Sequence, residues 1–295
     1  MKPNPAVFGE ALARAEAVFG GSLPRPVALD ARSKHLRRLV VRGLTGGGRG
    51  HVGSAFSVIE ILRVLYDDVL RYRVEEPKWP GRDRCILSKG HGCLGLYALL
   101  ADKGFIQELE LDRFSHFEGI LGGHPEHGKV PGVEASTGAL GHGPPIGVGM
   151  ALAARLQGRD SRVFVITGDG EINEGSVWEA AMCAAKHRLD NLTVIVDYNK
   201  HQSFGPTAEV QDLEPLADKW ESFGFAVQEV DGHDVAGLRK VLTGLPYARG
   251  EKPNAIIAHT IKGKGVSFVE NNMKWHHKSN LPAAELAAVY RELEG

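Results

Sequence analysis

Residues 163–199, VFVITGDGEINEGSVWEAAMCAAKHRLDNLTVIVDYN, carry the strongest structural signal in the chain. Two apolar runs of strand length, 163–166 and 192–196, flank a segment, 174–188, in which apolar residues recur at helical spacing. A strand, a helix and a second strand in this order form a βαβ unit with parallel strands and a right-handed crossover. The pattern therefore predicts a parallel sheet in this half of the chain.

The same alternation continues on both sides of this unit. Further segments with strand or helix patterns are predicted as follows: helices over 8–19, 31–44, 57–69, 93–100 and 235–245, strands over 85–88, 225–230 and 255–260, and a loop over 75–83. Alternating strands and helices without a repeat period predict an α/β fold with a doubly wound, mostly parallel sheet flanked by helices. We expect one domain over 31–295, preceded by an N-terminal helical extension over 1–30.

Residues 117–149 are dominated by glycine, proline and histidine, and we expect mostly ordered loop there. So long a stretch without regular structure inside a compact domain is uncommon and tends to be functional. On the 174–188 helix we expect Trp178 and Met182 to face the core, and Glu174 to cap the helix N-terminus with its carboxylate.

The composition excludes several classes of protein. The 295 residues carry a formal net charge of −1, which gives no basic footprint for nucleic acid or anionic membrane. Only three cysteines occur and none has C-x-x-C spacing, which argues against a disulfide framework and favours a reducing cytoplasm. We find no secretory signal at the N-terminus and no run of 18 apolar residues.

Polar residues follow two consecutive predicted strands. Gly168-Asp169-Gly170 comes after the 163–166 strand, and Asn199 comes after the next strand, 30 residues beyond Asp169. Carboxyl ends of parallel strands form the ligand-binding edge of an open sheet, so both side chains should lie at that edge. Carboxylate and amide oxygens suit Mg²⁺ or Ca²⁺, and glycines let phosphate oxygens approach the backbone. A plain β-turn with an asparagine cap explains GDG alone, but not the whole pattern.

Histidine provides a second signal. Five of the thirteen histidines directly follow glycine: His51, His91, His124, His142 and His233. Each alone is compatible with a hydrogen-bonded surface role, yet four at loop positions indicate function. The pair His124 and His127, with Glu126 between them, has the ligand types of a zinc site. However, Pro125 disfavours a helix through the pair, and no H-E-x-x-H or paired-cysteine motif is present.

Two later features can each be interpreted either as ordinary surface residues or as part of a functional site. Lys262, in the sequence IKGKG, follows a strand and is either a solvated lysine or a phosphate contact. The run Trp275-His276-His277 is a surface cluster or part of a site.

Taken together, GDGEINEGSVWEAA, the spacing to Asn199 and the ordered Gly-His loops resemble the transketolase family, from about Leu36 to His276. The similarity is greatest to N-terminal subunits of transketolases made of two chains. It implies the thiamine-diphosphate-binding fold, with thiamine diphosphate and Mg²⁺ as cofactors. It also implies transfer of a two-carbon ketol unit from a ketose or ketose phosphate donor to an aldose acceptor.

The resemblance assigns roles to individual residues. It implies Mg²⁺ ligands from the side chains of Asp169 and Asn199 and from the backbone carbonyl of His201, where the family usually has an apolar residue. The residues that it implies in cofactor binding are Ser54, His91, the turn Gly138-Ala139-Leu140, Gly170, Glu171, Asn199, Lys262 and His276. The implied catalytic residues of the substrate channel are His51, His124 and His276.

The resemblance also implies a partner. In the family, a glutamate on a second, pyrimidine-binding domain activates the cofactor, and that domain would follow Gly295. We therefore expect a C-terminal pyrimidine-domain partner chain in an α₂β₂ heterotetramer with active sites between chains, Glu174 at the interface and an exposed apolar patch. Small sugar or sugar phosphate substrates are expected, and the sequence does not identify the donor or the acceptor.

Three other functions are compatible with parts of the sequence. One is a subunit of a 2-oxo acid dehydrogenase or decarboxylase, which shares GDG and the asparagine but not the Gly-His loops. Another is a non-catalytic binding subunit, against which the intact Asp169, Asn199, His91 and His124 argue. The third is a zinc hydrolase built on residues 124–127.

Overall fold

The central element is a five-stranded parallel sheet in the order β2-β3-β4-β6-β5. The computed structural model describes residues 28–294. The strands are β2 (Arg84–Leu87), β3 (Val163–Gly168), β4 (Leu192–Tyr198), β5 (Ala226–Asp231) and β6 (Asn254–His259). All five strands predicted from the sequence are confirmed to within about two residues, and so is the α/β fold class.

Helices cover both faces of the sheet because successive strand residues point to opposite sides. In β3, Val163 and Val165 belong to one buried apolar cluster, while Phe164 and Ile166 belong to the other. This two-sided burial explains why β3 and β4 are apolar along most of their length. The sheet is doubly wound, as predicted.

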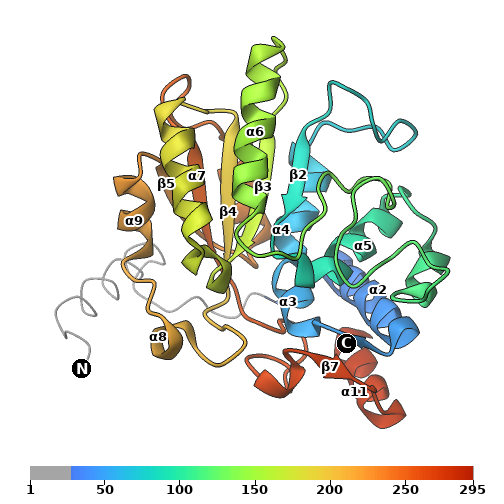
Figure 1. Cartoon of the computed structure of the whole chain (residues 1–295). Helices are drawn as coiled ribbons and strands as arrows, with labels where there is room; N and C mark the ends of the chain where they lie inside the picture. Colours follow the sequence, from blue (N-terminus) through green and yellow to red (C-terminus); the bar gives the residue numbers. More distant parts are fainter. Residues whose placement is uncertain (1–27, 295) are drawn as a thin grey trace.

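Each face has its own set of helices, and Figure 1 shows the green and yellow helices of one set in front of the sheet. The first apolar cluster includes residues of α6 (Gly143–Leu156), α7 (Gly175–Lys186) and α9 (Leu216–Ser222). The second includes residues of α2 (Ala31–Gly47), α3 (Val52–Ser57), α4 (Ile59–Val64), α5 (Cys93–Asp102), α10 (Val235–Thr243) and α11 (Ala283–Glu294).

Local chemistry sets the helix boundaries. The Asp30 side chain accepts a hydrogen bond from the Ser33 N–H at 2.8 Å and so caps α2, which ends at Gly48 with a left-handed φ of 65°. Asp234 caps α10 in the same way, accepting from Ala236 N–H at 3.0 Å. These caps place α2 and α10 close to their predicted starts at 31 and 235.

Three predictions about local structure were wrong. The loop expected over 117–149 ends at residue 142, because α6 begins at Gly143; prolines are tolerated in a first helical turn, where no N–H is needed. Met182 does not face the core, since its side chain is 57% exposed on the outer side of α7. The helix predicted from residue 57 starts at Val52 and is divided into α3, α4 and a π-helical turn, Leu65–Val69. The predicted helix over 8–19 lies outside the described residues.

A short second sheet joins the two ends of the described chain. In it, β1 (Arg49–Gly50) pairs antiparallel with β7 (Lys278–Ser279). The remaining short elements are α8 (Thr207–Val210) and 3₁₀ turns over 90–92, 108–113, 170–173 and 273–275. This pairing brings the segment after α2 beside the segment that carries His276 and His277.

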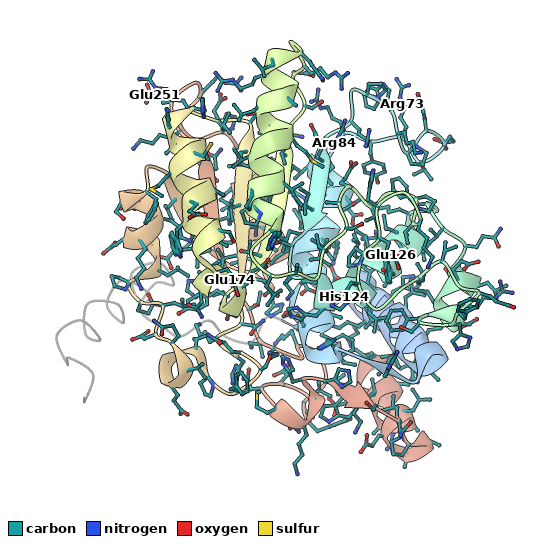
Figure 2. The ribbon with its side chains drawn as sticks, viewed as in Figure 1. Arg73, Arg84, His124, Glu126, Glu174 and Glu251 are labelled. Carbon is teal, nitrogen blue, oxygen red and sulfur yellow. The ribbon has the colours of Figure 1, made fainter. Side chains whose placement is uncertain are left out.

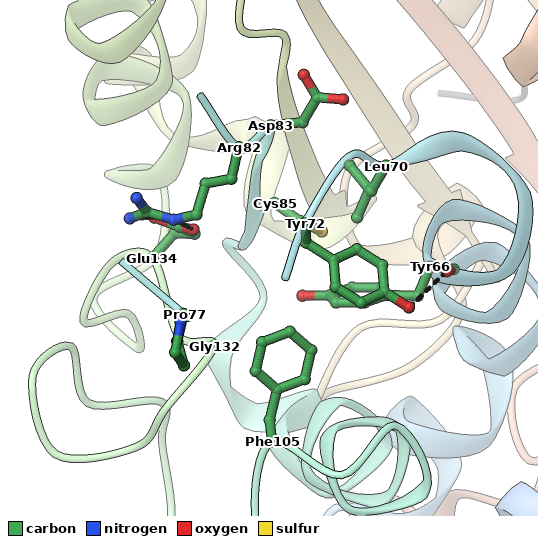
Figure 3. A pocket seen from close by; sticks show the side chains of 10 residues that line it. All are labelled: Tyr66, Leu70, Tyr72, Pro77, Arg82, Asp83, Cys85, Phe105, Gly132 and Glu134. Carbon is green, nitrogen blue, oxygen red and sulfur yellow. Dashed lines mark hydrogen bonds and ion pairs between the residues drawn. The ribbon is translucent and has the colours of Figure 1, made fainter. Parts of the chain in front are cut away.

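A small aromatic pocket lies beside the N-terminal end of β2, opposite the strand ends that carry the predicted site (Figure 3). The rings of Tyr66, Tyr72 and Phe105 pack in tilted and edge-to-face arrangements at centroid distances of 5.4–6.4 Å, and the Tyr72 hydroxyl donates to the Tyr66 carbonyl at 3.0 Å. Burial raises the pKa of the Cys85 thiol in its wall to about 12, which disfavours the nucleophilic thiolate form. Within residues 28–294, no helix has the length and apolar character needed to cross a bilayer.

Two glycines of α6 provide a matched test of the packing between this helix and the sheet. A Cβ on Gly147 would lie 2.5 Å from Val165 Cγ2, whereas a Cβ on Gly149 would meet nothing within 4 Å. We expect Gly147→Ala to lower the free energy of unfolding by about 1–3 kcal/mol through overpacking. Gly149→Ala should raise it by up to about 1 kcal/mol through helix propensity. Urea denaturation of both variants checks this, and equal effects would contradict the packing described.

Candidate functional site

The candidate site lies where four strands end at the same edge of the sheet. Loops after β2, β3, β4 and β6 carry His91, Asp169, Asn199 and Lys262 respectively. These strands are neighbours in the sheet, so residues far apart in sequence converge there. His51, at the start of α3, and the segment around His276 also face this edge, as the histidine ring contacts described below show.

Asp169 is the most buried of the predicted metal ligands, at 2% exposure. Its Oδ1 accepts from the Gly170 N–H at 2.7 Å and its Oδ2 from the Lys200 N–H at 2.5 Å. Burial and the nearby Asp197 carboxylate raise the pKa of Asp169 to about 6. The carboxylate therefore lies in a region where a cation would strongly favour its charged form.

Asn199 and the His201 carbonyl lie next to this carboxylate. Asn199 is buried, and its Oδ1 accepts from the His201 N–H at 3.2 Å. Lys262 donates from Nζ to the His201 carbonyl at 3.0 Å, and burial lowers the pKa of this lysine to about 8. The lysine ammonium therefore contacts the carbonyl that the sequence assigns to the metal.

The carboxylate of Glu171, which the resemblance implies in cofactor binding, is surrounded by hydrogen-bond donors of the protein itself. Its Oε1 accepts from the Gly141 N–H at 2.9 Å and from the Ser88 hydroxyl, and its Oε2 accepts from the Gly168 N–H at 3.0 Å. Both carboxylate oxygens are thus occupied by protein donors. The side chain ties the loop after β2, the end of β3 and the start of α6 together.

The turn Gly138-Ala139-Leu140 lies against two other predicted site segments. A Cβ on Gly138, whose φ is 129°, would lie 2.6 Å from the His124 ring, and a Cβ on Gly90 would lie 2.7 Å from the Gly138 nitrogen. Only glycine at these two positions allows so close an approach. Ala139 and Leu140 are exposed beyond this contact, and Figure 2 shows His124 beside the same edge of the sheet.

Four histidine rings form a cluster above the strand ends. His51 lies at the centre, with ring centroids 5.4 Å from His91, 5.7 Å from His276 and 4.8 Å from His277. Burial, then the neighbouring imidazoles, lower the pKa of His51 to about 4; burial and Lys262 lower that of His276 to about 4. Burial also holds the pKa of His91 well below its usual value. These three rings are therefore neutral at pH 7.

Three buried polar atoms around the cluster have no hydrogen-bond partner: Ser54 Oγ, Gln202 Nε2 and His276 Nδ1. Ser54 is 1% exposed on α3, and the Gln202 side chain packs over Gly170, where a Cβ would lie 2.9 Å from Gln202 Cγ. Buried groups of this kind normally find a partner, so their concentration here points to a polar ligand.

Below the site lies a buried ion pair between Lys89 and Asp197. Lys89 also donates to the Ser54 carbonyl at 3.0 Å, and the Ser57 hydroxyl donates to Asp197 at 2.6 Å. Burial alone would raise the pKa of Asp197, but Lys89 holds it below its usual value. The pair links the loop after β2 to β4 and to α3.

These groups fit a magnesium ion and a diphosphate. A carboxylate, an amide oxygen and a backbone carbonyl are hard oxygen donors suited to Mg²⁺, and the Lys262 ammonium is a donor suited to phosphate oxygens. A zinc site has no such support, because the part of the chain described contains no group of three His, Cys, Asp or Glu residues able to hold a metal. The His127 ring, from the zinc hypothesis, is bonded to the Val133 carbonyl at 2.8 Å.

Nearly the whole described chain matches one protein family. Residues 30–294 fit the family described as transketolase, thiamine diphosphate binding domain. The chain belongs to the transketolase family.

Relatives in this family include separate subunits. One of them, from the apulose-4-phosphate transketolase of Phocaeicola vulgatus, is 42% identical over 257 residues, which cover 87% of this chain and 90% of the relative. The 6-deoxy-6-sulfo-D-fructose transketolase subunit SqwG of Clostridium sp. is 41% identical over 268 residues, covering 91% and 97%. Human transketolase is 35% identical over 271 residues, but these are 90% of this chain and 43% of the human protein.

Solved transketolase structures agree with the fold. The enzyme from Leishmania mexicana superposes with a TM-score of 0.83 at 33% identity, covering 90% of this chain and 42% of that one. The Campylobacter jejuni transketolase gives a TM-score of 0.83 at 30% identity, covering 89% and 42%. The chain thus spans about two fifths of the solved transketolases that it matches.

Some features of the site were missed or misjudged from the sequence. The sequence pattern assigns no site role to His277, whose ring lies 4.8 Å from that of His51, nor to Gln202 or Lys89. The position of Lys89, directly before Gly-His-Gly at a strand end, was an available signal. Glu174 does occupy the N-cap position of α7, but its side chain makes no capping hydrogen bond and is exposed (Figure 2).

The raised pKa of Asp169 predicts how stability changes with pH in the chain without metal and cofactor. A carboxyl whose pKa is about 6 in the folded state and 3.8 in the unfolded state loses its favourable contribution as pH rises from about 4 to 6. Wild type should therefore lose stability relative to the Asp169→Asn variant as the pH rises, because asparagine does not ionise. Between pH 4 and pH 7 the unfolding free energy of the variant should gain roughly 2–3 kcal/mol on that of wild type. Urea denaturation across this range measures the difference, and a constant difference would contradict the assigned environment.

Proposed function

We propose that this chain is the diphosphate-binding subunit of a two-chain transketolase that depends on thiamine diphosphate and Mg²⁺. It would transfer a two-carbon ketol unit from a ketose or ketose phosphate to an aldose. The observation that carries the proposal is the convergence of Asp169, Asn199 and the His201 carbonyl beside Lys262 and the histidine cluster. The similarity to separate subunits of apulose-4-phosphate transketolases, along about 90% of their length, supports the two-chain form.

The oxygen donors would hold the metal, and the loops around them the diphosphate. Asp169, Asn199 and the His201 carbonyl would bind Mg²⁺. Diphosphate contacts would come from Ser54, His91, Gly170, Lys262 and His276, of which Ser54 and His276 have unpartnered buried atoms. The turn 138–140 would approach the aminopyrimidine, and the side chain of Glu171 would position this turn rather than touch the cofactor. When bound, thiamine diphosphate supplies the carbon nucleophile and the electron sink for C–C cleavage.

The histidines would orient the sugar and move protons. Because His51 and His276 are neutral at pH 7, each imidazole has one nitrogen free to accept a proton and one N–H to donate. His124 lies across the turn 138–140 from them and is exposed. Together the three rings would hold the donor's hydroxyl groups and assist proton transfer during C–C cleavage.

A partner chain would complete the site. Leu140 lies just before α6, Leu156 at the C-terminal end of α6 and Met182 on α7, and all three apolar side chains are exposed. We propose that a pyrimidine-domain subunit covers this side, contacts Glu174 and forms an α₂β₂ assembly. The three free cysteines support a reducing, cytoplasmic setting. Residues 31–295 would form the cofactor domain, with 1–30 as an extension.

Calorimetric titration tests the proposal. Thiamine diphosphate with Mg²⁺ is titrated into the chain mixed with a pyrimidine-domain partner, and into the chain alone. We expect Asp169→Ala to weaken cofactor binding at least about 100-fold, because a solvent oxygen cannot replace the buried carboxylate on the metal. Ketol transfer should be lost in parallel.

Glu251→Ala is the matched control, since Glu251 is exposed at the opposite edge of the sheet (Figure 2). This variant should bind the cofactor as wild type does. If the unsubstituted chain binds no thiamine diphosphate with or without a partner, the cofactor assignment is wrong and a non-catalytic subunit takes its place.

A further inference from the structure

The loop that carries Lys262 is held in part by backbone hydrogen bonds, from the Asn271 N–H to the Lys262 carbonyl at 2.8 Å and from the Gly263 N–H to the Gly53 carbonyl at 3.0 Å. Two glycines follow the lysine, Gly263 and Gly265, and both have left-handed φ values, 83° and 99°. Lys262 nevertheless reaches into the site and contacts the His201 carbonyl. Its position therefore depends on contacts that the loop makes with the rest of the fold.

Two side chains hold the loop on either side of Lys262. The Ile261 N–H donates to His233 Nε2 at 2.8 Å, and the Lys264 carbonyl accepts from Arg37 Nε at 2.7 Å. Both side chains are buried: Arg37 is completely inaccessible to solvent and His233 is 4% exposed. The two contacts fix the backbone one residue before and two residues after the lysine.

Both side chains converge on the carboxylate of Glu60. Arg37 donates to its two oxygens at 2.6 and 2.9 Å, and His233 Nδ1 lies 2.8 Å from Oε2. Burial alone would raise the pKa of this fully buried carboxyl, but Arg37 and then His233 hold it well below its usual value. Glu60 is thus an ionised anchor joining α2, α4, the loop after β5 and the Lys262 loop.

The hydrogen bonds determine the tautomer of His233. A backbone N–H can only donate, so Nε2, which faces the Ile261 N–H, must be an unprotonated acceptor. Nδ1 therefore carries the proton and donates it to Glu60. Without the Glu60 acceptor, nothing would keep the proton on Nδ1. In the tautomer with the proton on Nε2, the Nε2–H would face the Ile261 N–H, and two donors would oppose each other.

We propose that His233 is a positioning residue for Lys262: held by Glu60 in its Nδ1–H tautomer, it fixes the Ile261 amide and thereby the approach of the Lys262 ammonium to a bound diphosphate. The identity of the anion rests on the proposed function. His233 itself touches neither the metal ligands nor the histidine cluster in the contacts described above.

Two amide substitutions each preserve one of the two hydrogen bonds of this imidazole. In His233→Gln the side-chain carbonyl can occupy the Nε2 position and accept from Ile261, while the bond to Glu60 is lost or weakened. In His233→Asn the amide nitrogen can occupy the Nδ1 position and donate to Glu60, but Ile261 loses its acceptor. Both variants lose one buried hydrogen bond, so a merely structural role for His233 predicts similar effects.

The measurement is the Kd of inorganic diphosphate with Mg²⁺, and of thiamine diphosphate with Mg²⁺, for the full chain with and without its partner chain. We expect about tenfold weaker binding in His233→Asn and a change within about twofold in His233→Gln, while both variants have a lower Tm. In a Lys262→Met background, His233→Asn should change the Kd no further, because the coupling runs through the lysine. Equal Kd values in the two amide variants would overturn the inference.

Hydrogen exchange of the Ile261 amide gives a second measurement that requires no ligand. Exchange should be faster in His233→Asn than in His233→Gln, and equal protection would also overturn the inference. If wild type binds neither probe, the proposed function fails, and the exchange comparison alone then decides whether His233 positions this loop.

Discussion

A lysine ammonium and an aspartate carboxylate lie buried against each other beneath the strand ends, and the arrangement of the site depends on this pair. Lys89 and Asp197 are both inaccessible to solvent, so removing either one leaves an uncompensated buried charge, at a cost of about 3–5 kcal/mol. Ser57 and Thr260 add hydroxyl donors to the Asp197 carboxylate. Side chains from three segments, the loop after β2, α3 and the loop after β6, therefore meet on one carboxylate of β4.

The pair also separates two carboxylates with opposite properties. Asp197 is neutralised by Lys89 and stays ionised, whereas Asp169, in the neighbouring strand end, has no such partner and a raised pKa. The ion pair under the site is thus neutral overall, while the Asp169 carboxylate, which faces the ligand, forms no ion pair of this kind. Such an arrangement reserves one negative charge for a bound cation.

The sequence predicted the strands and most helices because β3, β4 and β6 are apolar runs buried on both faces, a pattern that survives without knowledge of tertiary contacts. It also placed Asp169, Asn199 and Lys262 at one edge, since parallel strands present their carboxyl ends together.

The sequence did not predict α6, whose start is rich in glycine and proline and is held by Glu171 and Ser88 rather than by local propensity. The clustering of His51 with His276 and His277, and the Arg37–Glu60–His233 network, depend on contacts between segments more than 150 residues apart. No local pattern encodes such contacts.

The pairing of β1 with β7 has a consequence for how the protein is made. Ribosomes release the N-terminal part of a chain first, and sheet β2-β3-β4-β6-β5 can assemble once residue 259 has emerged. His51, however, acquires its two neighbours at 276 and 277 only when the strand that follows them pairs with Arg49 and Gly50. The histidine cluster therefore closes only after residue 279 has emerged, and a nascent chain that already has its sheet is still without a complete site.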